Sequence, residues 1–108
     1  MKSALFALAL LLGVAGPTVA QPYPNKPIKV IVPYPAGGNA DITVRVVSKK
    51  MSEILGVAVV VENRGGANGM IGTDIVAKSA PDGYTLIAPA SGPIVINPVL
   101  YNLSLIHI

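Results

Sequence analysis

The run PAGGNAD, residues 35–41, is the segment whose residue types most directly suggest chemistry. Gly37 and Gly38 would let a ligand approach the backbone closely. Where a loop leads into a helix, its free amides and the positive end of the helix dipole can hold an anion without a cationic side chain. Asp41 stands where we expect the helix N-cap, and capping would itself shape such a site. The run therefore predicts an anion site, with a simple tight turn as the alternative.

Two rival glycine motifs fail on their spacing. A P-loop needs a second glycine directly before Lys-Ser or Lys-Thr, and Lys78-Ser79 is instead preceded by Ala77, although Gly72 lies at the right distance. A dinucleotide fingerprint needs G-x-G-x-x-G after the first strand, which residues 35–41 do not provide. The sequence therefore argues against nucleotide binding, and we expect no cofactor.

Side chains suited to catalysis or metal binding are few. His107 is the only histidine, cysteine is absent, and Ser91 has no evident base partner. The five acidic residues are dispersed, so we expect no catalytic residues and no metal site. Arg64 could pair with a ligand carboxylate, or it could have a structural role in which it organises the glycine loop or pairs with Glu62 or another acid. A secreted α/β enzyme that uses Ser91 or Asp41 is the alternative.

Alternating strand and helix patterns surround these residues. Strands are predicted at 29–32, 58–61 and 84–88, with helices at 42–55 and 70–79, the first of which should end at Gly56. The residues expected to face the sheet are Val44, Val47, Met51, Ile54 and Leu55 in the first helix and Ile71, Ile75 and Val76 in the second. This order predicts an α/β fold with a parallel βαβαβ sheet. The loops at 33–41, 63–69 and 89–97 should then meet at one sheet edge, where open α/β sheets bind ligands.

Residues 1–20 have the pattern of an export signal. A positive residue, Lys2, precedes an apolar run at 4–14, and Thr18-Val19-Ala20 resembles a cleavage site. The alternative is a retained membrane anchor. The apolar run argues against it, because it is shorter than the about 20 residues that span a bilayer. The net charge of +3 is spread along the chain, and Lys49-Lys50 is the only adjacent cationic pair. We therefore expect export and no binding to nucleic acid.

Three stretches carry a family resemblance: KPIKVIVPYPAGGNAD at 26–41, the long run from VVVENRGGANG to DGYTL at 59–86, and INPVLY at 96–101. Together they resemble the substrate-binding receptors of tripartite tricarboxylate transporters, the Bug family, over about residues 23–101. Gly65 departs from the proline that the family usually has there.

The resemblance implies a two-lobed fold of the periplasmic binding protein type II-like class, which closes around its ligand. It implies a monomer in the periplasm that passes a small di- or tricarboxylate to the membrane components of the transporter. Carried over by motif, the ligand-binding residues are Pro35, Ala36, Gly37, Gly38, Asn39 and Asp41 of the first loop and Ser91 and Asn97 of the third.

The end of the sequence departs from the family pattern after Tyr101. We expect residues 1–20 to be the signal peptide, 21–103 to be part of the N-terminal lobe, and 104–108 to be a non-native tail joined to a truncated reading frame. A chain of this size buries a smaller fraction of its surface than a larger domain does, and it has no disulfide to compensate. An inactive structural fragment is therefore a further alternative.

Overall fold

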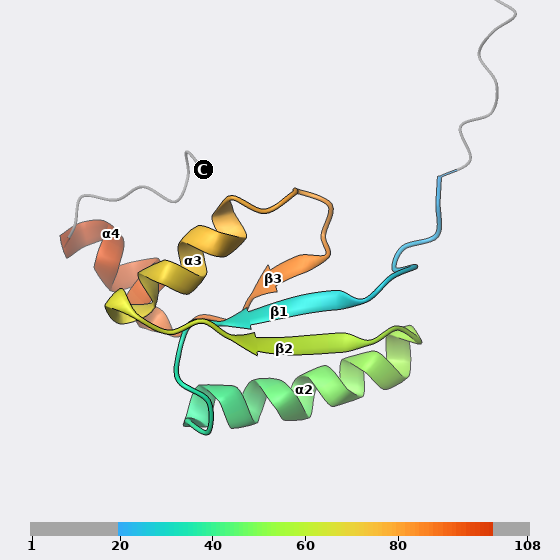
Figure 1. The fold of residues 1–108 in the computed structure, drawn as a ribbon, viewed down its shortest axis with the longest axis horizontal. Coiled ribbons are helices and arrows are strands. Elements are labelled where there is room, and N and C mark those ends of the chain that lie inside the picture. Colours follow the sequence, from blue (N-terminus) through green and yellow to red (C-terminus); the bar gives the residue numbers. More distant parts are fainter. Residues whose placement is uncertain (1–19, 101–108) are drawn as a thin grey trace, which may run out of the picture.

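A three-stranded parallel sheet forms the centre of the computed structural model, which describes residues 20–100. The strands β1 (Ile28–Val32), β2 (Val59–Asn63) and β3 (Thr85–Ile87) lie in the order β2-β1-β3 (Figure 1). In the register, Val30 pairs with both Val61 and Leu86. Ile28, Val30, Ile31 and Val32 are buried. Successive side chains of a strand point to opposite faces, so β1 is covered on both, as its run of β-branched residues predicts.

Two helices cover the sheet from opposite sides (Figure 1). Helix α2 (Asn39–Leu55) connects β1 to β2 and packs against both strands, whereas α3 (Met70–Ala77) connects β2 to β3 and packs against β1 and β3. The predicted α/β class and parallel βαβαβ order are confirmed. Within residues 20–100, none of the helices has both the length and the apolar character that a membrane crossing requires.

The start and the rotation of α2 differ from the prediction. Gly38, rather than Asp41, is the N-cap, and Gly56 ends the helix in the left-handed conformation, with φ of 69°, as predicted. Asp41 and Ser48, two turns apart, are the buried residues of α2, whereas Val47 and Ile54 are 52% and 73% exposed. Leu55 is also exposed, at 38%, so the expected apolar face was wrong for Val47, Ile54 and Leu55. Asp41 accepts hydrogen bonds from the Gly37 amide of the preceding loop and from Asn63 of β2, and these bonds hold its face of the helix inward. The spacing of apolar residues gives no information about such polar contacts.

A glycine lies at the inward face of α3. A Cβ added at Gly72 would lie 2.7 Å from the Arg64 carbonyl oxygen and 2.8 Å from the Pro33 Cβ, so the helix backbone approaches the end of β1 very closely. Ile71 and Ile75, which we expected to face inward, are exposed. That prediction was wrong because the close approach puts the smallest residue on the inner face.

The segment after β3 is largely helical. The predicted loop at 89–97 contains a π-helical turn, η2 (Gly92–Ile96), which continues into a short helix, α4 (Asn97–Leu100). Pro93 lies in the first turn of η2, where the missing amide hydrogen costs no hydrogen bond. The predicted signal peptide, except for Ala20, and the predicted non-native residues 104–108 lie outside the described residues.

Candidate functional site

The segments that leave the three strands meet at one edge of the sheet. Next to this edge, the Arg64 amide donates to the Val32 carbonyl at 2.8 Å, and the Ala88 amide donates to the Ile31 carbonyl at 2.9 Å. A Cβ added at Gly69, which follows β2, would lie 2.5 Å from Pro93, which follows β3. The predicted convergence is therefore confirmed, and contacts link the segments directly.

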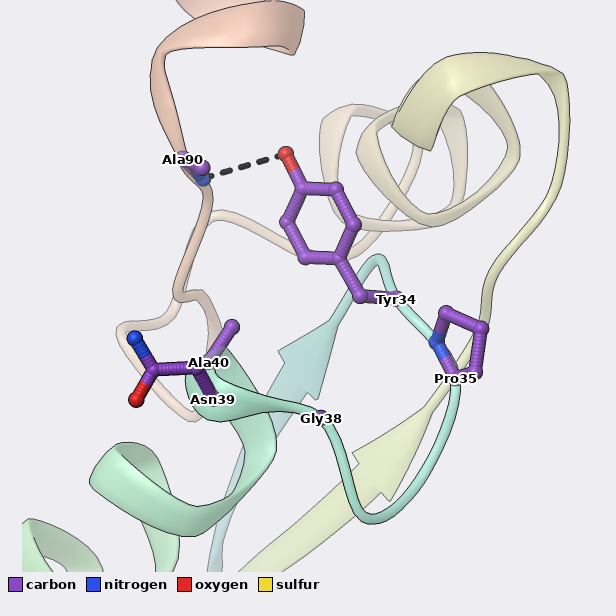
Figure 2. A pocket seen from close by; sticks show the side chains of 6 residues that line it. All are labelled: Tyr34, Pro35, Gly38, Asn39, Ala40 and Ala90. Atoms are coloured by element: carbon purple, nitrogen blue, oxygen red, sulfur yellow. Dashed lines mark hydrogen bonds between the residues drawn. The ribbon is translucent and has the colours of Figure 1, made fainter.

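An open pocket of about 420 Å³ lies where the first and third of these segments meet (Figure 2). It is lined by Tyr34, Pro35, Gly38, Asn39, Ala40 and Ala90. The ring of Tyr34 extends toward the third segment, and its hydroxyl oxygen accepts a hydrogen bond from the Ala90 amide at 3.3 Å. None of these lining residues carries a charge, so any polar recognition here depends on amides and uncharged side chains.

The first turn of α2 forms one wall of this pocket. The first hydrogen bond inside the helix runs from the Ile42 amide to the Gly38 carbonyl at 3.0 Å. The amides of residues 39–41 precede it, and the first amides of a helix have no acceptor within the helix. In the described part of the chain, no side chain caps α2 at Gly38. Gly38, Asn39 and Ala40 line the pocket, so the positive end of the helix dipole lies at its wall.

Asp41 is buried beneath this wall and is fully hydrogen-bonded. Its Oδ2 accepts from the Gly37 amide at 2.8 Å, and its Oδ1 accepts from Arg45 Nε and Asn63 Nδ2, each at 2.9 Å. The Gly37 amide, followed by Arg45 and Asn63, lowers the pKa of Asp41 to about 2. The carboxylate is therefore ionised at neutral pH, and both of its oxygens bond to groups other than the first amides of α2.

Asn63, the last residue of β2, joins three parts of the site. Its Nδ2 donates to the Tyr34 carbonyl at 3.1 Å as well as to Asp41, and its Oδ1 accepts from Arg45 Nη2 at 2.9 Å. Arg45 lies one turn after Asp41 in α2; its Nε donates to Asp41 and its Nη2 donates to Asn63. A charged network therefore connects α2, β2 and the loop after β1.

A second amide pair holds the loop after β2 to the start of α4. Asn97 is 1% exposed, its Nδ2 donates to the Asn68 carbonyl at 3.1 Å, and its Oδ1 accepts from Asn68 Nδ2 at 2.9 Å. Asn68 has φ of 54°, a left-handed conformation that asparagine adopts more readily than most residues. Both ends of the Asn97 amide are thus hydrogen-bonded within the protein.

Arg64 pairs with the neighbouring acid. Its Nε donates to Glu62 Oε1 at 2.6 Å, and Lys29 Nζ lies 3.3 Å from Glu62 Oε2. Arg64, followed by Lys29, lowers the pKa of Glu62. Of the two roles considered for Arg64, the structure contains the pairing with Glu62.

Sequence comparison assigns the chain to a family. Residues 43–105 match the model of the tripartite tricarboxylate transporter family receptor. The chain belongs to this receptor family. BugT of Bordetella pertussis is 48% identical to this chain over 93 residues, which cover 86% of this chain and 27% of BugT. The chain thus spans about a quarter of the length of the curated relatives it matches.

Solved structures agree with this assignment. A periplasmic transporter matches with a TM-score of 0.73 and 45% identity over 78% of this receptor chain and 28% of its own. Two proteins of Rhodopseudomonas palustris also match: one was solved with adipate, and the other, MatC, was solved with malate. They match with TM-scores of 0.60 and 0.58 at 36% and 38% identity, over 61% and 60% of this chain and 22% of each of theirs. The periplasmic binding protein fold is thus confirmed for the matched part.

The residues predicted for ligand binding occupy three kinds of position in this receptor chain. Pro35, Gly38 and Asn39 line the pocket, while Ala36 and Gly37 lie in the loop between them. Asp41 and Asn97 are buried and bonded to other residues, and Ser91 is exposed directly before η2. The structure does not bring all eight into one pocket, and their contact with a ligand stays a prediction.

Several residues of the site were not predicted. Tyr34, Ala40 and Ala90 line the pocket, and Arg45 and Asn63 hold Asp41. Asp41 and Arg45 are four residues apart, which in a helix is a recognised signal for an ion pair, but the predicted helix began one residue after Asp41. Tyr34 and Ala90 carried no signal beyond their place in predicted loops. Among residues 20–100, no group of three or more His, Cys, Asp or Glu side chains is placed to hold a metal ion.

Proposed function

We propose that this receptor binds a small di- or tricarboxylate in the periplasm and passes it to the membrane components of a tripartite tricarboxylate transporter, acting as a monomer and without catalysis. The observation that carries the proposal is the first turn of α2, which no side chain of residues 20–100 caps, at the wall of an uncharged pocket. The matched structures with adipate and malate support a carboxylate as the ligand.

The physical basis is the attraction between an anion and a helix N-terminus. The unpaired amides of the first turn and the helix dipole favour negative charge, and both act at short range. A pocket of about 420 Å³ is large enough for a small organic acid, since ligand pockets commonly measure about 300–1,000 Å³. Backbone recognition of this kind selects for charge and shape without a cationic side chain.

The proposed ligand-binding residues divide by position. Pro35, Gly38 and Asn39 line the pocket and are the proposed direct contacts, with Ala36 and Ser91 beside them in the sequence segments that form its rim. Gly37, Asp41 and Asn97 would contribute by holding these segments. We propose that residues 21–103 form part of the N-terminal lobe, and that residues 1–20 direct export.

Calorimetry and thermal unfolding with malate and adipate test the proposal. At about a hundred times its dissociation constant, a ligand should add about 2.7 kcal/mol to the free energy of unfolding. The uncharged diamides of both acids have similar shapes and should have no effect, because they lack the charge that the helix dipole favours. The proposal is wrong if neither acid binds, or if the diamides bind equally well. An absence of binding is also what an inactive structural fragment predicts.

A pair of variants at Asn39 isolates the contribution of the backbone. Asn39→Pro removes one amide hydrogen at the first helical position, where proline is well tolerated, and the extended conformation of Gly38 suits a following proline. Hydrogen bonds to charged groups contribute about 1.5–3 kcal/mol, so malate should bind at least about tenfold more weakly. Asn39→Ala, which keeps the amide, is the matched control. Equal affinity of both variants for malate would show that the Asn39 amide is not a donor to the ligand.

The alternative of a secreted α/β enzyme has less support. Ser91 is exposed, and both carboxylate oxygens of Asp41 are already hydrogen-bonded in the described part of the chain. A hydrolytic nucleophile needs an adjacent base, and Asp41 would need a free oxygen to accept a proton. The geometry thus favours binding over turnover.

A further inference from the structure

We propose that Asp41, Arg45 and Asn63 act as one positioning unit, which holds the loop at 34–38 and keeps the first amides of α2 available to the ligand. This inference deepens the proposed function and rests on it. None of the three residues lines the pocket, so each would act through the backbone groups that it holds.

The first step concerns the negative charge of Asp41. A carboxylate in the first turn of a helix is well placed to bond to the free amides there, and it would then compete with an anionic ligand. Here Oδ2 bonds to the Gly37 amide, which precedes the helix, and Oδ1 bonds to Arg45 and Asn63. These three bonds occupy the carboxylate, so among residues 20–100 the amides of residues 39 and 40 are left without a side-chain partner.

The second step concerns the charge of Arg45. Its guanidinium lies 2.9 Å from Asp41 Oδ1 and neutralises the carboxylate locally. The net field at the start of α2 is then dominated by the helix dipole, which attracts an anion. The planar guanidinium also reaches Asn63 with a second nitrogen, at 2.9 Å, which a lysine ammonium does not reproduce.

The third step connects the unit to the pocket. Asn63 lies at the end of β2, paired in the sheet with Val32, and donates to the carbonyl of Tyr34, which lines the pocket. Asp41 holds the amide of Gly37, whose φ of 84° turns the chain directly before Gly38. The unit therefore holds the loop at both ends, beside Tyr34 and beside Gly38, which both line the pocket.

Two measurements on the 108-residue chain test the inference. The first uses no ligand and records the amide NMR signals of Gly37 and Gly38. The second measures the affinity for malate. In Asp41→Asn the single remaining oxygen should face the two donors Arg45 and Asn63, which places the NH₂ group against the Gly37 amide. We therefore expect the Gly37 signal to shift toward that of an unbonded amide. Malate should then bind about 10- to 100-fold more weakly, as when outer-shell partners of metal ligands are lost.

Asp74→Asn is the matched control. Asp74 pairs with Lys78 at the same spacing of four residues, at 2.7 Å, but this pair lies on the exposed surface of α3. The control should change neither the Gly37 signal nor malate affinity. Arg45→Lys keeps the charge without the two-nitrogen contact and should have an intermediate effect, whereas Arg45→Met should resemble Asp41→Asn.

The possible outcomes separate this inference from the proposed function. If Asp41→Asn leaves the Gly37 signal in place, or binds malate as tightly as Asp74→Asn does, the positioning role is wrong. Should Asp41→Asn fail to fold, the comparison of Arg45→Lys with Arg45→Met decides by the same criteria. If the unaltered chain binds neither malate nor adipate, the proposed function fails and the inferred effect on the ligand fails with it. The amide signals then decide whether the unit holds the loop.

Discussion

Asp41 is the residue on which the proposed site depends most. It is 3% exposed, and its three donors come from the loop, from α2 and from β2. Burial of a charge is unfavourable unless it is paired and hydrogen-bonded, and here both conditions are met. Because the donors favour the ionised form, the pKa of Asp41 falls to about 2 from its ordinary value of 3.8.

This lowered pKa predicts an acid-sensitive fold. Because Asp41 has the lower pKa in the folded state, its contribution to stability is complete above about pH 4 and is lost as the pH falls toward about 2. The free energy of unfolding, measured by thermal unfolding at several pH values between about pH 5 and pH 2, should show this loss. The Asp41→Asn variant should be less stable at neutral pH, and its free energy of unfolding should change less with pH. The lowered pKa values of Glu62 and Asp82 should leave part of the slope in the variant. An unchanged slope would contradict the assignment to Asp41.

At the scale of elements, the sequence predicted what local patterns determine. The strands were found because β-branched runs stand between prolines and glycines, and the end of α2 was found from Gly56. The rotation of α2 was not predicted, because it depends on a contact between Asp41 and Asn63, which are 22 positions apart in the sequence. The burial of Asn97 depends in the same way on Asn68, 29 positions away. The spacing of apolar residues does not predict such polar pairs.

The close approach of α3 to the end of β1 predicts a large effect at Gly72. Gly72→Ala would put a methyl group within 3 Å of the Arg64 carbonyl oxygen and of Pro33, so helix and strand must move apart. Overpacking of this kind costs about 1–3 kcal/mol, which urea unfolding would measure. Gly92→Ala is the control, because its methyl group would meet Asn68 at an ordinary 3.5 Å. Equal stability of the two variants would show that α3 is not tightly placed.

At the scale of the whole molecule, the described part exposes several large apolar side chains. They lie on α2, at Ile42, Val46 and Ile54, and on η2 and α4, at Ile94, Val95, Val99 and Leu100. The matched part is about a quarter of the length of BugT. In the same described part, the buried isoleucine and valine side chains, Ile28, Val30, Ile31 and Val32, all belong to β1.

Export is a whole-molecule prediction that can be tested directly. If residues 1–20 are a signal peptide, the periplasmic product of bacterial expression should begin at Gln21, as N-terminal sequencing or intact mass would show. Ala20→Leu should prevent this cleavage, because the cleavage site requires small residues. A product that keeps Met1 and stays in the membrane fraction would instead support a retained anchor.

The uncharged pocket wall at the start of α2 has a consequence for divergence. Its proposed anion-holding groups belong to the main chain, so every substitution except proline leaves them in place. Side chains at positions such as 35, 39 and 40 are then free to vary in size and polarity. A gene duplicated many times could thus acquire new cargo acids by single substitutions, while the attraction for a carboxylate is inherited unchanged.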